Sequence, residues 1–383
     1  MQALLTEEER MLQATVRDFA DRELAPRAAA LDHTEVFPSE NLRAMGALGL
    51  MGLTIPEAYG GAGATCAQLA LAAEELARAC AATSVIHLTH LSLGAETIVR
   101  FGTDEQRRRY LPRLASGEHL AAFALTEPSS GSDAADIQTR AATDGNDYVL
   151  DGNKTFITNG PEADVTVVFA ATDRAARSRG VSTFVVGKGA AGLTITPQHG
   201  KLGMRASTTA ELAFDGCCVP AADRLGAEGD GFHIAMSILD SSRITVAAQA
   251  LGIGQAAFEA AVQYAQQRET FGKPLAEQQA IQFMLADMAT RLDAARLLTR
   301  RAAQLKDVDQ PITKAAAMAK LYASEAAHFA CDKALQIHGG YGYFNESPVE
   351  RLYRDQRVTE IYEGTSEIQR IVIARSVLKE LAL

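Results

Sequence analysis

The sequence predicts an α+β fold that is mainly α, with three domains in chain order. Apolar residues recur at helical intervals at both ends of the chain, while short apolar runs rich in valine, phenylalanine and threonine fill the middle. A chain of 383 residues also exceeds the size at which single cores stop growing. We expect an N-terminal helical domain over residues 1–118, a middle antiparallel, β-barrel-like domain over 119–227, and a C-terminal four-helix bundle over 228–383.

The N-terminal third carries a helical pattern. In "TEEERMLQATVRDFADRELAP", Met11 or Leu12, Val16 and Phe19 recur every three or four residues, and we expect Pro26 to close the helix. Two further stretches predict helices, "CAQLALAAEELARAC" and "ATSVIHLTHLSLGAETIVRFG". The second is apolar on most sides, so we expect it to lie centrally.

The middle zone predicts strands. Short apolar runs such as "AAFALT", "DVTVVFAA" and "VSTFVVG" are separated by turn residues without an intervening helix. This spacing is typical of an antiparallel sheet or a small barrel. The tripeptide "DGN" at 151–153 predicts a hairpin turn between two of the runs.

From Gly229 onward the helical period returns. A stripe of apolar residues follows Pro274 and predicts one long helix: Ile281, Met284, Leu285, Met288, Leu292 and Ala295. Helices over about 231–267, about 312–337 and from about 366 would complete an antiparallel four-helix bundle.

Composition and charge exclude several classes of protein. The formal net charge is −10, which argues against nucleic-acid binding, and no apolar run is long enough to cross a membrane. Consecutive glutamates in "MQALLTEEER" argue against a secretory or transit segment, so we expect a cytoplasmic protein. Five cysteines without a C-x-x-C pair fit a reducing compartment. His87 and His90 share a helical face without a third ligand nearby, so we predict no metal site.

Some segments suggest a nucleotide, although no strand–helix–strand unit surrounds them. "YGGAG" (59–63) therefore reads as a loop. In "QIHGGYGY" (336–343), the two glycines either cap a helix or let the backbone approach a pyrophosphate. Arg268 is either solvated or placed to meet phosphate. The hydroxyl-rich loop "ALTEPSSGSD" (124–133) and the strand end "FITNG" could together present donors to a flat polar heterocycle.

The segment "TEIYEGTSEIQR" (359–370) holds three glutamates with different explanations. We expect Ser366 to be a helix N-cap, because Gln369 completes a capping box, and Glu367 to be the first helical residue. An arginine from "ERLYRDQR" is expected to pair with Glu360. Neither explanation applies to Glu363, which is either an exposed loop acid or, if it faces inward, a general base with a raised pKa.

The same stretches resemble the acyl-CoA dehydrogenase family, most strongly its short-chain (butyryl-CoA) branch, over nearly the full length. The resemblance is most specific in "ALTEPSSGSDA", "FITNG", "KLGMRAST", "RETFGKPLAEQQAIQFMLADM", "QIHGGYGY" and "RDQRVTEIYEGTSEIQR". It implies the helical–β–helical fold and FAD as cofactor. It also implies a homotetramer, a dimer of dimers, that passes electrons to an electron-transfer flavoprotein.

The resemblance also implies where FAD would lie. The flavin would contact the loop from 125 to 134, which includes Leu125, Thr126, Gly131 and Ser132, as well as Phe156, Ile157 and Thr158. The FAD of a neighbouring subunit would be reached by Arg268, Phe271, Gln279, Gln336, Gly339 and Gly340. Its adenosine half would lie near Thr365 and Glu367.

The resemblance assigns the substrate and catalytic residues in the same way. Acyl-CoA would contact Ser132, Asp240, Arg243, Tyr362 and Gly364. Glu363 matches the catalytic base that removes the α-proton, while the β-hydrogen passes as hydride to FAD to leave a trans-2-enoyl-CoA. Some family members carry the base at the position of Ser242, which cannot act as a base here.

Other features leave alternatives open. Phe156 stands where tryptophan is common, and Ser129–Ser130 replaces a pair that usually contains glycine. A related flavin oxidase, an enzyme for branched or dicarboxylic acyl-CoA, and a non-enzymatic acyl-CoA-binding relative are the alternative functions. If His87 and His90 face the acyl tail, a polar acyl group is expected; otherwise they face solvent or a subunit contact.

Overall fold

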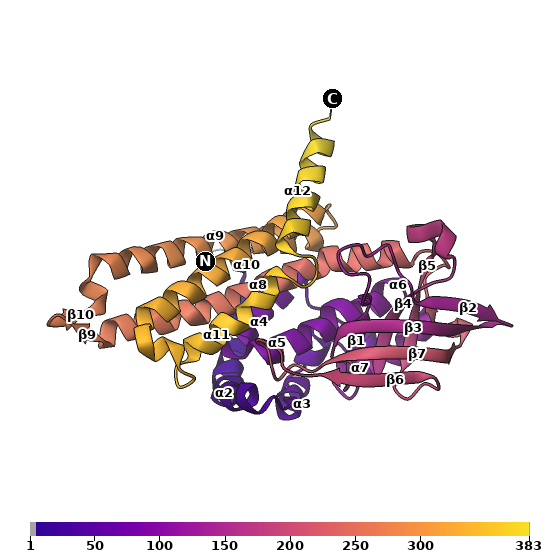
Figure 1. Ribbon diagram of the computed structural model, residues 1–383, viewed down its shortest axis with the longest axis horizontal. Coiled ribbons are helices and arrows are strands. Elements are labelled where there is room, and N and C mark those ends of the chain that lie inside the picture. The colour runs from indigo at the N-terminus through magenta and orange to yellow at the C-terminus, as the bar shows by residue number, and fades with distance from the viewer. Residues whose placement is uncertain (1–4, 383) are drawn as a thin grey trace.

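Helices from both ends of the chain pack together, and a β-sheet adjoins them at one end of the molecule (Figure 1). The computed structural model describes residues 5–382, so the first four residues of the N-terminal stretch discussed above lie outside it. The predicted fold class, helical–β–helical, is confirmed. The domain boundaries at 118/119 and 227/228 stay predictions.

The N-terminal part is helical throughout. Its elements are α1 (Glu7–Phe19), η2 (Ala20–Leu24), α2 (Ala25–Thr34), α3 (Ser39–Ala47), η3 (Leu50–Gly52), η4 (Glu57–Tyr59), α4 (Cys66–Ala79), α5 (Ala81–Leu88), η5 (Thr89–Ala95), α6 (Glu96–Phe101) and α7 (Asp104–Ala115). The central position expected for the 82–102 stretch is confirmed, because α5 and η5 are buried along their whole length. The prediction that Pro26 ends the first helix is wrong. A π-helical turn, η2, leads into α2, where Pro26 occupies the first turn and its missing N–H costs nothing.

The middle part forms one eight-stranded sheet with the order β6-β7-β3-β2-β4-β5-β8, and β1 pairs with β4. Most neighbours are antiparallel, as expected, but β1 and β2 both run parallel to β4. The strands are β1 (Ala121–Ala124), β2 (Arg140–Asp144), β3 (Asp147–Thr158), β4 (Val165–Ala171), β5 (Val181–Gly187), β6 (Leu193–Gln198), β7 (Thr209–Val219) and β8 (Arg224–Leu225); η6 (Arg174–Gly180) and η7 (Ala221–Asp223) are short helical turns.

The predicted hairpin turn at "DGN" is wrong. Residues 151–153 lie inside β3, where the pairing with β7 shifts register between Leu150 and Gly152. Gly152 has φ 143°, and a Cβ atom there would meet the Cα of Thr139 at 2.6 Å. The glycine therefore serves a β-bulge, and the chain reverses instead around Gly145, at φ 59°, between β2 and β3.

The C-terminal part contains three long helices that lie side by side (Figure 1). These are α8 (Gly231–Gln267), α9 (Gln279–Asp307) and α10 (Thr313–His338), and a short hairpin of β9 (Glu269–Thr270) and β10 (Lys273–Pro274) precedes η8 (Leu275–Glu277) and α9. The chain continues through η9 (Gly339–Tyr343), α11 (Pro348–Gln356), η10 (Arg357–Glu360) and α12 (Ser366–Glu380). In Figure 1, α12 contacts α10 and then projects away from the long helices.

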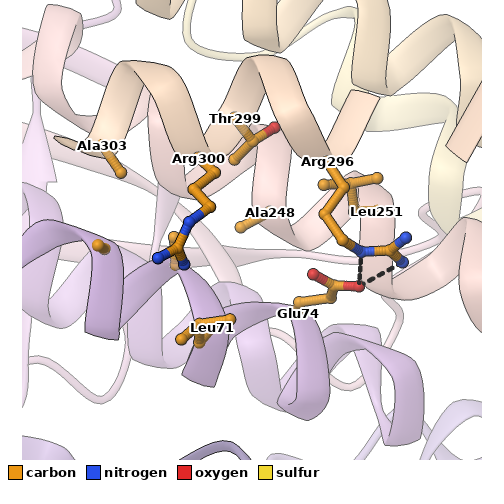
Figure 2. A pocket seen from close by; sticks show the side chains of 10 residues that line it. Leu71, Glu74, Ala248, Leu251, Arg296, Thr299, Arg300 and Ala303 are labelled. Atoms are coloured by element: carbon orange, nitrogen blue, oxygen red, sulfur yellow. Dashed lines mark hydrogen bonds and ion pairs between the residues drawn. The ribbon is translucent and has the colours of Figure 1, made fainter. Parts of the chain in front are cut away.

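Charged side chains join the N-terminal and C-terminal helices (Figure 2). Glu74 on α4 accepts hydrogen bonds from Arg296 on α9 at 2.7 and 2.9 Å, as Figure 2 shows. Arg300 on α9 pairs with Glu9 on α1 at 2.9 Å. The space between α4, α8 and α9 has a volume of about 20 Å³, which is room for about one water molecule. This junction therefore holds helices together and has no room for an organic ligand.

Membrane-spanning helices and clusters of metal-ligating side chains are both absent from the described residues. Within residues 5–382, no helix is both long and apolar enough to span a membrane. The same part of the chain contains no group of three or more histidine, cysteine, aspartate or glutamate side chains that could hold a metal ion.

Candidate active site

Glu363 lies on the short turn between η10 and α12, in a backbone conformation that non-glycine residues rarely adopt. Its φ is 51°, and that of the following Gly364 is 94°. Glycine adopts positive φ freely, whereas a glutamate there is strained by about 1 kcal/mol or more. Such strain persists only where the surrounding structure holds it, and it is common at functional sites.

The Glu363 side chain points inward. The hydroxyl of Ser242 on α8 donates a hydrogen bond to its Oε2 atom. Although the residue as a whole is only partly buried, its carboxyl group is enclosed, and this burial raises its pKa. The hydrogen bond from Ser242 and the charges of Lys320 and Arg243 oppose that rise. Of the two interpretations left open above, the exposed loop acid is excluded.

Side chains from three helices hold the backbone of this turn. Arg243 Nε on α8 donates to the Glu363 carbonyl at 3.3 Å. Lys320 Nζ on α10 and Gln369 Nε2 on α12 both donate to the Gly364 carbonyl at 2.8 Å. Sequence reasoning missed Lys320 and Gln369. A lysine inside the alanine-rich α10 pattern was the one available signal, because its neighbours predict a buried face.

The other two glutamates of the segment have structural partners. Arg357 Nη1 donates to Glu360 at 2.7 Å, so the predicted arginine pairing is confirmed, and His328 Nδ1 lies 2.7 Å from the same carboxylate. The predicted N-cap at Ser366 is wrong. Thr365 is the N-cap, and its hydroxyl accepts from the N–H of Ile368, so Ser366 is already helical. Glu367 is therefore the second helical residue, and it is exposed.

Asp240 and Arg243, the residues expected to contact acyl-CoA, form an ion pair on α8 with Nη1 and Oδ1 2.5 Å apart. Arg243 is buried, and Asp240 also accepts from the Thr313 hydroxyl at 2.6 Å. The neighbouring Tyr362 donates to Gln249 Oε1, and Gln249 Nε2 donates in turn to the Ala81 carbonyl at 3.2 Å. A fixed positive group thus lies beside the Glu363 turn.

The two hydroxyl-bearing strand ends of the sheet lie together. Thr126 follows β1, and its carbonyl accepts from the N–H of Thr155 on β3 at 2.9 Å. Beyond this link, Gly131 and Ser132 are exposed, Ile157 is buried, and Thr158 is partly buried. Phe156 has φ 58° and is 68% exposed, so its ring is free to contact a ligand.

A buried ion pair supports this loop, and the sequence analysis missed it. Lys154 on β3 is fully buried; its Nζ lies 2.7 Å from Glu127 Oε1 and donates to the Leu125 carbonyl at 3.1 Å. Glu127 also accepts from the N–H groups of Gln138 and Thr139. The 125–139 loop is therefore fixed from beneath by charge-assisted hydrogen bonds.

Between the sheet and the Glu363 turn lies a cavity of about 240 Å³. Thr158 and Tyr362 line it, together with Val85, Val358 and residues 201–204 between β6 and β7. Its walls are mainly apolar with a few polar groups, which suits one part of a flat heterocycle such as flavin. The residues present therefore fit an FAD site that begins at this cavity.

The remaining predicted cofactor residues lie elsewhere. Arg268, Phe271, Gln279, Gln336, Gly339 and Gly340 are exposed. They lie in or beside the β9–β10 hairpin and at the ends of α9 and α10, and Figure 1 shows this hairpin at the end of the long helices opposite to the sheet. The guanidinium of Arg268 lies 5.8 Å from the ring centroid of Tyr341, which joins the two segments. Gly339 does cap α10, with φ 58°. The structure thus gathers these residues at one end of the long helices, away from the sheet whose strand β3 ends at Thr158.

His87 and His90 are packed inside the fold and do not face solvent. Both are fully buried: His87 Nε2 lies 2.8 Å from the Leu50 carbonyl, and His90 accepts from the Ala121 N–H at 3.1 Å. Burial lowers the pKa of each ring to about 4, so both are neutral at neutral pH. The alternative that they face solvent is therefore wrong, because both rings are packed inside the fold.

Comparison with known proteins assigns all three parts of the chain to one family. Models of the acyl-CoA dehydrogenase N-terminal, middle and C-terminal domains match residues 6–118, 122–217 and 229–378. The chain belongs to the acyl-CoA dehydrogenase family. It is 50% identical to an acyl-CoA dehydrogenase of Bacillus subtilis over 98% of this chain and 99% of the relative. It is also 50% identical to the mitochondrial short-chain specific acyl-CoA dehydrogenase of Mus musculus, over 98% and 91%.

Solved structures with chains similar to this one support the same family. Butyryl-CoA dehydrogenase from Megasphaera elsdenii has a TM-score of 0.95 at 42% identity, over 98% of this chain and 99% of that one. A chain from the structure of the electron transferring flavoprotein of Acidaminococcus fermentans has a TM-score of 0.97 at 45% identity, over 98% and 99%. Glutaryl-CoA dehydrogenase of Mycobacterium smegmatis, in complex with FADH2, has a TM-score of 0.94 at 34% identity, over 100% and 97%.

These findings confirm the predicted family. They also confirm the predicted enzyme class, because an acyl-CoA dehydrogenase is an oxidoreductase. Acyl-CoA dehydrogenases are FAD enzymes, so the predicted cofactor is confirmed at the level of the family. The roles of individual residues stay predictions.

Proposed function

We propose that this acyl-CoA dehydrogenase converts a short-chain acyl-CoA to the trans-2-enoyl-CoA, with Glu363 as the base that removes the α-proton. The observation that carries the proposal is the enclosed carboxyl group of Glu363, held inward on a strained turn beside the cavity that Thr158 and Tyr362 line. An acid with a raised pKa is a better general base near neutral pH than an exposed carboxylate. The proposal that the acyl group of the substrate is short is supported by the 50% identity to a short-chain specific enzyme.

The chain supplies groups for each part of this reaction. Arg243 and Asp240 would orient the thioester, and the ionised Glu363 carboxylate would take the proton from Cα. Within the described residues, the N–H of Glu363 donates no hydrogen bond, so it is available to stabilise negative charge on the thioester oxygen. Bound FAD would supply the acceptor for the hydride that leaves Cβ as the double bond forms.

FAD would be held by residues from two copies of the chain. Leu125, Thr126, Gly131, Ser132, Phe156, Ile157 and Thr158 would surround the flavin, while Thr365 and Glu367 would lie nearer the adenosine. The residues at the far end of the long helices would bind the FAD of a neighbouring subunit; they are Arg268, Phe271, Gln279, Gln336, Gly339 and Gly340. This is supported by the position of β9 and β10 at the end of the long helices opposite to the sheet in Figure 1, and by the exposure of Phe271 and Tyr343, at 98% and 80%. Large exposed aromatic side chains are typical of subunit contacts. We therefore propose the homotetramer.

Reduced FAD would pass its electrons to an electron-transfer flavoprotein. The similarity to a chain from the electron transferring flavoprotein structure of Acidaminococcus fermentans supports that partner. The exposed ring of Phe156, beside the proposed flavin site, is a candidate contact for it.

The test is purification with the cofactor followed by anaerobic titration with acyl-CoA thioesters of graded length. We expect flavin bleaching to be fastest with short straight chains, and Glu363→Gln to keep FAD while losing bleaching. Full activity in Glu363→Gln would refute the base assignment. Faster bleaching with branched or dicarboxylic thioesters, or peroxide release in air in place of electron transfer to the flavoprotein, would favour the alternative enzymes.

A further inference from the structure

Lys320 is a fully buried lysine in the middle of α10, surrounded on that helix by alanines. Moving an ammonium group out of water is costly, and buried lysines are usually paired directly with a carboxylate. Among the described residues, the fully buried Lys154 and the partly buried Lys306 both have this arrangement. Lys154 lies 2.7 Å from Glu127, and Lys306 lies 2.9 Å from Glu96.

No carboxylate is within ion-pair distance of Lys320 among residues 5–382, and its one hydrogen bond there goes to the Gly364 carbonyl at 2.8 Å. The charged groups around it come from four elements. The strongest interaction is attraction to Glu363 on the turn, followed by repulsion from Arg243 on α8; Glu360 of η10 and Glu367 of α12 attract it more weakly. The buried charge is therefore balanced mainly by the proposed catalytic base and by the residue that follows it.

The Glu363–Gly364 turn needs support because both residues have positive φ. Lys320 Nζ and Gln369 Nε2 both donate to the same Gly364 carbonyl at 2.8 Å, from α10 and α12. Two donors from different helices fix the Gly364–Thr365 peptide group, one residue beyond Glu363, and so restrain the backbone that carries the Glu363 side chain. Of these two donors, only Lys320 also carries a charge.

We propose that Lys320 is a positioning residue for Glu363: it anchors the Glu363–Gly364 turn through the Gly364 carbonyl, and its positive charge keeps the enclosed carboxylate in the ionised form. The assignment rests on the proposed function for its catalytic meaning, but the electrostatic part holds whether or not Glu363 is the base.

The pH dependence follows from the same contacts. Burial lowers the pKa of Lys320 to about 8, and burial raises the pKa of Glu363. Below about pH 8 the lysine is charged and favours ionised Glu363; as the pH rises through about 8 that support is lost. Removing the charge altogether leaves burial less opposed, so the pKa of Glu363 has to rise further.

The experiment titrates the Glu363 carboxyl group by difference infrared spectroscopy on the FAD-loaded enzyme. The band of interest is the one that Glu363→Gln removes. In Lys320→Met, which keeps a side chain of similar length, we expect the titration midpoint to rise by about one pH unit, a tenfold change in the dissociation constant. The acidic limb of the kcat/KM profile should move by the same amount. Lys320→Arg, which restores the charge, should recover part of the shift.

The control is Lys306→Met, which removes a partly buried lysine that bonds Glu96 and Ser241 and makes no bond to the Glu363–Gly364 turn. It should leave the midpoint unchanged. An unchanged midpoint in Lys320→Met would overturn the proposal. If Lys320→Met does not fold, Lys320→Gln is titrated in the same way, and an unchanged midpoint in that variant would also overturn the proposal. Activity in Glu363→Gln would instead remove the base assignment, while the infrared midpoints would still decide the role of Lys320.

Discussion

The hydroxyl of Ser242 on α8 donates a hydrogen bond to Oε2 of Glu363, joining two residues 121 positions apart in the chain. The resemblance to the family implied an alternative position for the base at Ser242. In this chain Ser242 supplies the hydrogen-bond donor, and Glu363 supplies the carboxyl group. The hydrogen bond stabilises the ionised form of the carboxyl group and lowers its pKa against the effect of burial.

Ser242→Ala is therefore expected to raise the pKa of Glu363. The acidic limb of kcat/KM should shift upward by about one unit, since a hydrogen bond to a charged group contributes about 1.5 kcal/mol and one pKa unit corresponds to about 1.4 kcal/mol. At a pH below that limb, activity should fall several-fold, with little change at high pH. Ser324→Ala removes a buried hydroxyl that bonds only the Leu321 carbonyl of its own helix, and it should leave the profile unchanged.

Lys154→Met is expected to weaken both the fold and FAD retention. Removing one member of a buried ion pair leaves the other charge uncompensated and costs about 3–5 kcal/mol. The hydrogen bond from Lys154 to the Leu125 carbonyl is lost as well, so the loop expected to hold flavin loosens. Unfolding in urea and the FAD content after dialysis measure the two effects. In the double variant Glu127→Gln/Lys154→Met, part of the stability should return; strictly additive losses would contradict the coupling.

Asp355→Asn is expected to stabilise the protein at neutral pH. Asp355 is buried at the end of α11, accepts a hydrogen bond from the Met204 N–H, and has a pKa raised to about 6, chiefly by burial. A raised folded-state pKa means that its contribution to stability is fully present below about pH 4 and is lost as the pH rises through 6.

The free energy of unfolding of the two proteins should consequently agree near pH 4. Above pH 6 the wild-type protein should be less stable by up to about 3 kcal/mol. Asparagine keeps an oxygen for the Met204 N–H, so the hydrogen bond survives the change. A constant difference between the two proteins across this pH range would show that Asp355 does not titrate there.

Gly203→Ala tests the packing of the 201–204 segment against α11. A Cβ atom on Gly203 would meet the backbone of Arg354 and Asp355 at 2.5 to 2.6 Å, which requires backbone movement. We expect a loss of stability of about 1–3 kcal/mol, as for other overpacked sites, together with weaker FAD binding because this segment lines the cavity. Gly187→Ala has open space around the new Cβ and should behave like the wild-type protein.

Local patterns predicted the elements well and their connections less well. The three zones of periodicity correspond to the helices and strands observed, because burying one face of each element requires that spacing. The wrong predictions relied on short local motifs, and contacts with neighbouring residues gave those motifs a different structure. "DGN" resembles a turn, but Gly152 lies against Thr139 across the sheet, and the cap next to Ser366 belongs to Thr365.

The sequence by itself determined the three-part fold and singled out Glu363, since helix capping and ion pairing explain the other glutamates of its segment. The tertiary structure alone decided that its carboxyl group faces inward. It also decided that Ser242 donates to this group, that Lys320 holds the turn, and that Lys154 pairs with Glu127 beneath the loop. Periodicity reports which face of an element is buried, but it carries no information on which distant side chains meet there. Those contacts depend on how elements pack in three dimensions, and they set the pKa values and positions on which the proposed chemistry rests.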